Sequence, residues 1–126
     1  IKREWRAFIK YDNLIDIRPY NGDWHYNYDA KTIDKVIEAF KIWEDRPVAC
    51  SLDFAVVERK GKVVKQTEDS LADNDKEYTY YETIFLEAND AYALGNYGLH
   101  HIAYAKLISA RWSQLLDRQD EFNFKI

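Results

Sequence analysis

Hydrophobic residues recur along this chain at two spacings, and each spacing predicts a different kind of element. Over residues 48–58 every second residue is apolar, which is typical of a strand with one buried face. Over residues 30–44 the apolar residues recur every three or four positions, which predicts an amphipathic helix, and Asp29 is suited to cap its start. A similar stripe predicts a second helix over residues 99–116.

The remaining alternating segments predict hairpins. Residues 3–10 and 14–20 flank an Asp-Asn turn signal, and Pro19 with Asn21-Gly22-Asp23 is expected to end the second strand. Residues 59–62, around Gly61, are expected to turn the chain into a short strand at 63–66. The acidic insertion 66–76 is expected to be a loop, and residues 77–89 predict one more strand.

The order of these elements defines the expected fold class. Hairpin-linked strands with interspersed helices predict an α+β domain, in which helices pack on one face of a mainly antiparallel sheet. The 126 residues are enough for one domain, 1–126, with its own core. Because the chain begins at Ile1 and contains no methionine, we expect a further segment upstream.

Composition and charge narrow the classes of function. The formal net charge of −4 gives no general attraction to nucleic acid or anionic lipid, and no apolar run has the length of a membrane span. The single cysteine, Cys50, excludes an internal disulfide and suits a reducing compartment, so we expect a cytoplasmic protein. Its place in an apolar strand favours a buried, inert thiol over a nucleophile.

Three oxygen-bearing side chains are the candidate metal ligands. Glu87 and Asn89 are two residues apart at the end of a predicted strand, so they share a face. Asp53 lies within the apolar run 48–58, where a charge is costly unless it is compensated. Such donors suit Mg²⁺ with nucleotide phosphates. The alternative is that Glu87 and Asn89 end a strand in solvent, while Asp53 pairs with a lysine or arginine.

Two arginines are the candidate phosphate ligands. Arg6 and Arg18 fall on the polar faces of the first predicted hairpin, at similar distances from its turn, which makes them candidate cross-strand neighbours. Two like charges side by side favour an anion between them, and the planar fork of arginine suits phosphate. The alternative is a pair of exposed arginines in weak ion pairs with Glu4, Asp16 or Asp23.

Four short motifs together resemble a known family. They are Glu-Trp-Arg-Ala-Phe-Ile at 4–9 followed by Arg18, Ser-Leu-Asp-Phe-Ala at 51–55, Phe-Leu-Glu-Ala-Asn-Asp at 85–90, and Ala-Leu-Gly-Asn-Tyr-Gly at 93–98 before a helix. Their order over residues 3–116 resembles the C-terminal half of an ATP-grasp domain, as in ATP-dependent carboxylate–amine ligases. Glu-Ala-Asn-Asp, followed by Ala-Leu-Gly-Asn-Tyr-Gly and a helix that carries Arg-Trp, is most similar to the clade named for two arginines and a lysine.

The resemblance implies a role for each candidate residue. Asp53, Glu87 and Asn89 would hold Mg²⁺, or Mn²⁺, against the phosphates of ATP, with Asn89 also near the nucleotide. Arg6 and Arg18 would contact the γ-phosphate or an acyl-phosphate intermediate, as nucleotide-binding and catalytic residues. The loop 95–98 would line the acceptor site.

The resemblance also implies the reaction, which is amide-type bond formation on a small-molecule or peptide substrate. The other lobe of the enzyme would precede Ile1, so this chain alone is not expected to catalyse the reaction. A non-catalytic binding or interaction module with the same fold is the competing hypothesis. The two differ in whether Asp53, Glu87 and Asn89 converge within reach of one metal ion.

Overall fold

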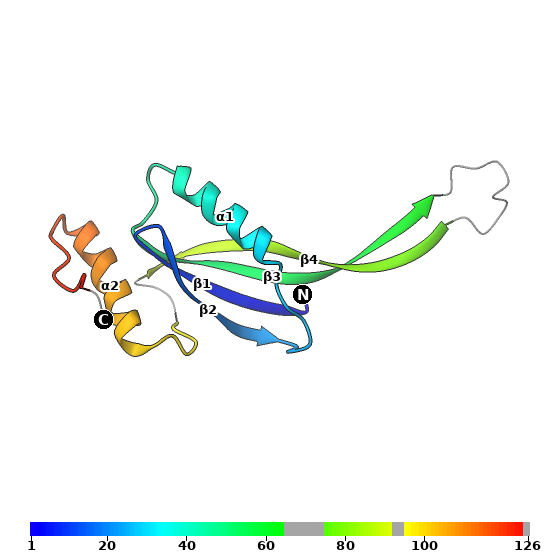
Figure 1. The fold of residues 1–126 in the computed structure, drawn as a ribbon, viewed down its shortest axis with the longest axis horizontal. Coiled ribbons are helices and arrows are strands. Elements are labelled where there is room, and N and C mark those ends of the chain that lie inside the picture. The colour runs from blue at the N-terminus through cyan, green and yellow to red at the C-terminus, as the bar shows by residue number, and fades with distance from the viewer. Residues whose placement is uncertain (65–74, 92–94, 125–126) are drawn as a thin grey trace.

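A computed structural model describes residues 1–64, 75–91 and 95–124, and contains a four-stranded sheet and two helices (Figure 1). The elements in chain order are β1 (Arg3–Lys10), β2 (Asn13–Gly22), α1 (Ala30–Ile42), β3 (Ala49–Val64), β4 (Asp75–Asp90) and α2 (His101–Leu115). The sheet order is β2-β1-β3-β4, with every neighbouring pair antiparallel. The predicted α+β class and antiparallel sheet are confirmed. No helix of the described segments has both the length and the apolar character needed to cross a membrane.

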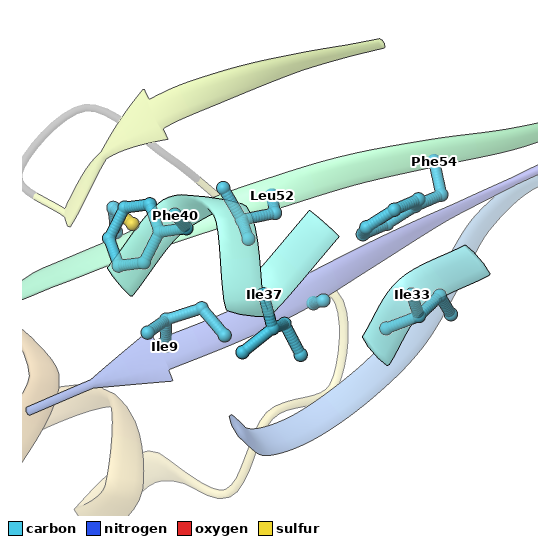
Figure 2. Close-up of a cluster of buried hydrophobic side chains, with 8 residues drawn as sticks. Ile9, Ile33, Ile37, Phe40, Leu52 and Phe54 are labelled. Carbon is cyan, nitrogen blue, oxygen red and sulfur yellow. The ribbon is translucent and has the colours of Figure 1, made fainter. Parts of the chain in front are cut away.

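One face of the sheet carries α1 and the larger core cluster. The cap predicted at Asp29 is confirmed, because its side chain accepts a hydrogen bond from the backbone N–H of Lys31. The apolar stripe of α1 lies on alternate residues of β1 and β3, and the side chains meet in a continuous cluster (Figure 2). The labelled members of that cluster are Ile9, Ile33, Ile37, Phe40, Leu52 and Phe54.

The opposite face carries α2, which corrects the prediction that both helices pack on one face. Phe8 and Ala49 alternate with the residues under α1 and cluster instead with Leu99, Leu107 and Ala110. In Figure 1, α2 lies at the end of the sheet, away from the long β3–β4 ribbon. The amphipathic pattern of a helix shows that one of its sides is covered, but it carries no information on which face of the sheet does so.

The turn predicted at residues 59–62 is wrong, because β3 continues through it to Val64. Residues 57–64 pair with β4 alone and extend beyond the other strands as a two-stranded ribbon (Figure 1). Gly61 lies opposite Tyr78, whose ring occupies the space that a Cβ atom at position 61 would fill. Glycine here lets the half-exposed Tyr78 ring lie close over the strand and does not mark a turn. Residues 65–74 of the predicted acidic loop lie outside the described residues.

Of the two end signals predicted for β2, Pro19 does not end the strand, which runs on to Gly22 within the second signal, Asn21-Gly22-Asp23. The pairing register between β1 and β2 shifts between Glu4 and Trp5, and Pro19 lies opposite Trp5 beside this shift. Since β2 is an edge strand, the missing N–H of proline costs no hydrogen bond to a further strand. The shift lets β2 continue and brings Tyr20 alongside the candidate site.

Candidate functional site

The candidate site lies on the sheet face that carries α2. Arg6 of β1 pairs in register with Asp53 of β3, and Asp53 pairs in turn with Glu87 of β4. Two residues away along the same strands, Ser51 of β3 is opposite Asn89 of β4. Because side chains alternate between the faces of a strand, these residues form a row across the three strands.

A buried ion pair forms the centre of this row. Asp53 is 1% exposed and Arg6 is 8% exposed. The Nε and Nη2 atoms of Arg6 donate to the two carboxylate oxygens of Asp53 at 3.0 and 2.9 Å, and the Ser51 hydroxyl donates at 3.2 Å. Burial disfavours the charge on Arg6, but Asp53 outweighs that effect, so the pKa of Arg6 is raised above its ordinary value.

Asn89 joins the two candidate carboxylates. Its Nδ2 atom donates to Asp53 Oδ2 at 2.9 Å and to Glu87 Oε1 at 3.3 Å. The carboxylates of Asp53 and Glu87 therefore point at one position, which is occupied by the NH₂ group of Asn89 with its partial positive charge. The structure brings the three predicted ligands together, and it also pairs Asp53 with an arginine, as in the alternative hypothesis.

The side chains of Asp53, Glu87 and Asn89 offer oxygen atoms of the kind that Mg²⁺ binds. Within residues 1–64, 75–91 and 95–124, no group of three or more His, Cys, Asp or Glu side chains is placed to hold a metal ion. The row instead offers two carboxylates and one amide, and Mg²⁺ commonly takes one or two carboxylates with phosphates and water. The donors therefore fit a Mg²⁺–nucleotide complex, provided that the amide of Asn89 turns its oxygen inward.

Arg18 lies directly beside Arg6, as the hairpin prediction required. Both arginines donate to backbone carbonyls of the loop before α2: Arg6 Nη1 to Gly95 at 3.1 Å and Arg18 Nε to Tyr97 at 3.4 Å. Gly98 has a φ of +91°, and a Cβ atom at that position would lie 2.8 Å from Arg18 Nη2. The loop that the ATP-grasp resemblance assigns to the acceptor therefore lies against both arginines.

Two tyrosines at the site were missed in the sequence analysis. The ring centroids of Tyr97 and Tyr20 lie 5.0 and 5.5 Å from the Arg6 guanidinium carbon, and 5.1 Å from each other. Both rings line an open pocket of about 550 Å³, whose other walls are Arg3, Pro19, Asn21 and Gly22. Burial raises the pKa of Tyr20 to about 12, so its hydroxyl stays protonated at neutral pH. Tyr97 lies in a loop, where hydrophobic periodicity gives no signal.

Side chains beyond the row hold α2 and the chain end in place. Arg111 donates from Nε and Nη2 to both carboxylate oxygens of Asp90, at 2.8 Å each. Asp120 accepts from the hydroxyls of Tyr11 and Ser109 at 2.6 Å each. These contacts anchor α2 at the end of the sheet and so position the start of the loop–helix segment.

Cys50 is fully buried beneath α1, which confirms the prediction of a buried thiol. Burial, with a smaller contribution from the Asp90 carboxylate, raises the pKa of Cys50 from an ordinary 9.0 to about 12. The thiol therefore stays protonated at neutral pH, and a thiol is a weak nucleophile.

Replacing Cys50 with alanine is expected to reduce the amount by which the free energy of unfolding falls as the pH is raised above neutral. In the unfolded chain the thiol ionises near 9.0, whereas the folded protein holds its proton up to about 12. Its contribution to stability is therefore complete below pH 9.0 and declines as pH rises toward 12. Urea unfolding at about pH 8 and about pH 10 should show a stability loss that is smaller in the variant by about 1.4 kcal/mol. Equal losses in the two proteins would contradict the assignment.

The family model described as ATP-grasp domain, R2K clade family 2, matches residues 1–107. No curated protein and no solved structure matches the chain. The family match covers β1 to the first half of α2, and so includes the whole row of candidate ligands and both arginines.

Proposed function

Since the chain belongs to the R2K clade of the ATP-grasp family, we propose that it is the ATP- and Mg²⁺-binding lobe of a ligase. The proposed reaction forms an amide-type bond through an acyl phosphate, on a small-molecule or peptide substrate. Enclosure of the phosphates by a second, upstream lobe is part of this proposal. The competing hypothesis, a binding module without chemistry, requires no nucleotide site.

The convergence of Asp53, Glu87 and Asn89 beside Arg6 and Arg18 is the observation that carries the proposal. Their order across the sheet places oxygen donors on one side and guanidinium groups on the other. A metal–triphosphate complex has matching parts, namely a cation that takes oxygen ligands and anionic oxygens that take N–H donors.

Each residue has a defined part in this arrangement. Glu87 is exposed, and among the described residues it accepts a hydrogen bond from Asn89 but forms no ion pair with an arginine, so it is the proposed anchoring carboxylate for the metal. Arg18 is the proposed γ-phosphate ligand, because it is only half-buried and is held by one long hydrogen bond to Tyr97. When bound, Mg²⁺ would neutralise phosphate charge and orient the transferred group. Arg6 and Arg18 would stabilise the negative charge that develops on the transferred phosphoryl group.

A titration with Mn²⁺ and ADP tests this proposal. We expect one Mn²⁺ to bind per chain in the presence of ADP, with binding weakened at least about tenfold in Glu87→Gln, because a metal ligand loses its charge. Isothermal calorimetry gives both affinities. Glu77→Gln is the matched control, since Glu77 is an exposed glutamate on the same strand but outside the site.

Two results would contradict the proposal. One is wild-type protein that binds neither Mn²⁺ nor ADP, which would favour the binding module. The other is Glu87→Gln that binds as tightly as Glu77→Gln, which would place the metal elsewhere. A reduced affinity in Glu87→Gln alone supports the assignment.

A further inference from the structure

We propose that Tyr97 is a positioning residue that holds the Arg6 guanidinium in place, and so couples the loop 95–98 to the carboxylate row. Its part in nucleotide binding rests on the function proposed above. Its contact with Arg6 does not, because that contact is made between two residues of the chain itself.

Arg6 is the link between the loop and the row. Its Nε and Nη2 atoms donate to Asp53, and its Nη1 atom donates to the Gly95 carbonyl. One planar group therefore joins a residue of β3 to a loop 42 positions further along the chain. If the loop moves, either the hydrogen bond from Arg6 to the Gly95 carbonyl or the plane of the Arg6 guanidinium must change. The plane of the guanidinium sets the geometry of its hydrogen bonds to Asp53.

Two aromatic rings keep that plane fixed. Tyr97 and Tyr20 both lie within cation–π range of the guanidinium, at 5.0 and 5.5 Å, and they contact each other at 5.1 Å. Tyr20 belongs to β2 and is fixed by the sheet, whereas Tyr97 belongs to the loop. The loop thus contributes to Arg6 one hydrogen bond from its backbone and one ring from a side chain.

The backbone of the loop 95–98 also supports a positioning role for Tyr97. The Tyr97 carbonyl accepts from Arg18, so this residue contacts one arginine with its ring and the other with its backbone. Tyr97 has a φ of +44° and is followed by Gly98, also with positive φ. This left-handed pair of residues turns the loop so that the ring and the carbonyl both face the arginines.

The Nε–H signal of Arg6 in a ¹⁵N NMR spectrum tests the proposal in the ligand-free protein. This N–H group is buried in the bond to Asp53, so its exchange with solvent reports how well the pair is held. We expect exchange to rise roughly tenfold in Tyr97→Leu, which removes the aromatic ring, and to stay unchanged in Tyr97→Phe, which keeps it. Because Tyr97 is 46% exposed, neither change is expected to unfold the protein.

Arg111 is the internal control, since its Nε–H is held by a similar two-pronged pair with Asp90 but belongs to α2 and not to β1. Faster exchange at Arg6 alone supports the proposal. Unchanged exchange at Arg6 in Tyr97→Leu overturns it, as does an equal rise in Tyr97→Phe. An equal rise at Arg111 would indicate general loosening and also overturns it.

The affinity for Mn²⁺ and ADP tests the functional half separately. It is expected to fall severalfold in Tyr97→Leu and to be restored in Tyr97→Phe. If the wild-type protein binds Mn²⁺ and ADP but Tyr97→Leu binds equally well, the coupling is refuted and the proposed function stands. If no variant binds them, the proposed function fails, and the exchange rate at Arg6 alone decides the positioning role.

Discussion

Replacing Asp53 with alanine is expected to lower the free energy of unfolding by about 3–5 kcal/mol. The change leaves the Arg6 guanidinium in a site where it is only 8% exposed and has lost two charge-assisted hydrogen bonds. An unpaired buried charge keeps its desolvation cost without the attraction that offset it. Chemical denaturation at neutral pH, with the unfolding slope checked for constancy, measures the loss.

Removing both charges separates the cost of an unpaired ion from the value of the pair. Arg6→Met combined with Asp53→Leu should lose much less stability than Asp53→Ala, because no charge remains buried. Asp90→Ala is the second control and should cost less than Asp53→Ala, because the Arg111 side chain is 16% exposed and keeps its hydrogen bond to Gln114. If the double variant is as unstable as Asp53→Ala, packing rather than charge dominates at this site.

Phe54→Ala is expected to destabilise the protein by about 3–5 kcal/mol through a different mechanism. Phe54 is completely buried between the sheet and α1, and no part of its ring is exposed (Figure 2). Truncation removes the hydrophobic burial and leaves a cavity that the surrounding strands and helix cannot fully close. Thermal and urea unfolding should both show the loss.

Phe85→Ala is the matched control for this prediction. The two rings lie 5.8 Å apart in an edge-on contact, yet Phe85 is 43% exposed. Because much of its ring is already in water, the same truncation should cost less than half as much. Equal losses for the two variants would show that the space under α1 is not packed as the structure describes.

Much of the candidate site could be predicted from local spacing. Glu87 and Asn89 share a face because side chains alternate along a strand, and Arg6 meets Arg18 because a short turn joins their strands. The pairing of Arg6 with Asp53 could not be predicted in this way. These residues are 47 positions apart, and any of several strand orders would have been compatible with the same hydrophobic pattern.

The errors in the predicted fold have a related cause. Gly61 and Pro19 are residues that commonly end strands, and both lie inside strands here. Pairing along the whole of β4 outweighs the local preference at Gly61, and an edge position with a register shift accommodates Pro19. Pairing between strands, and not the local preference of these two residues, thus decided how far β2 and β3 extend.

The sequence by itself determined the kinds of element, the cap at Asp29, the antiparallel α+β class and the family, because these depend on neighbouring residues and short motifs. Only the tertiary structure decided that α2 covers the face opposite α1, that Arg6 neutralises Asp53, and that Tyr97 packs on Arg6. Those contacts join residues far apart in the chain. Their free energy depends on burial and charge in the assembled fold, which periodicity along the chain does not encode.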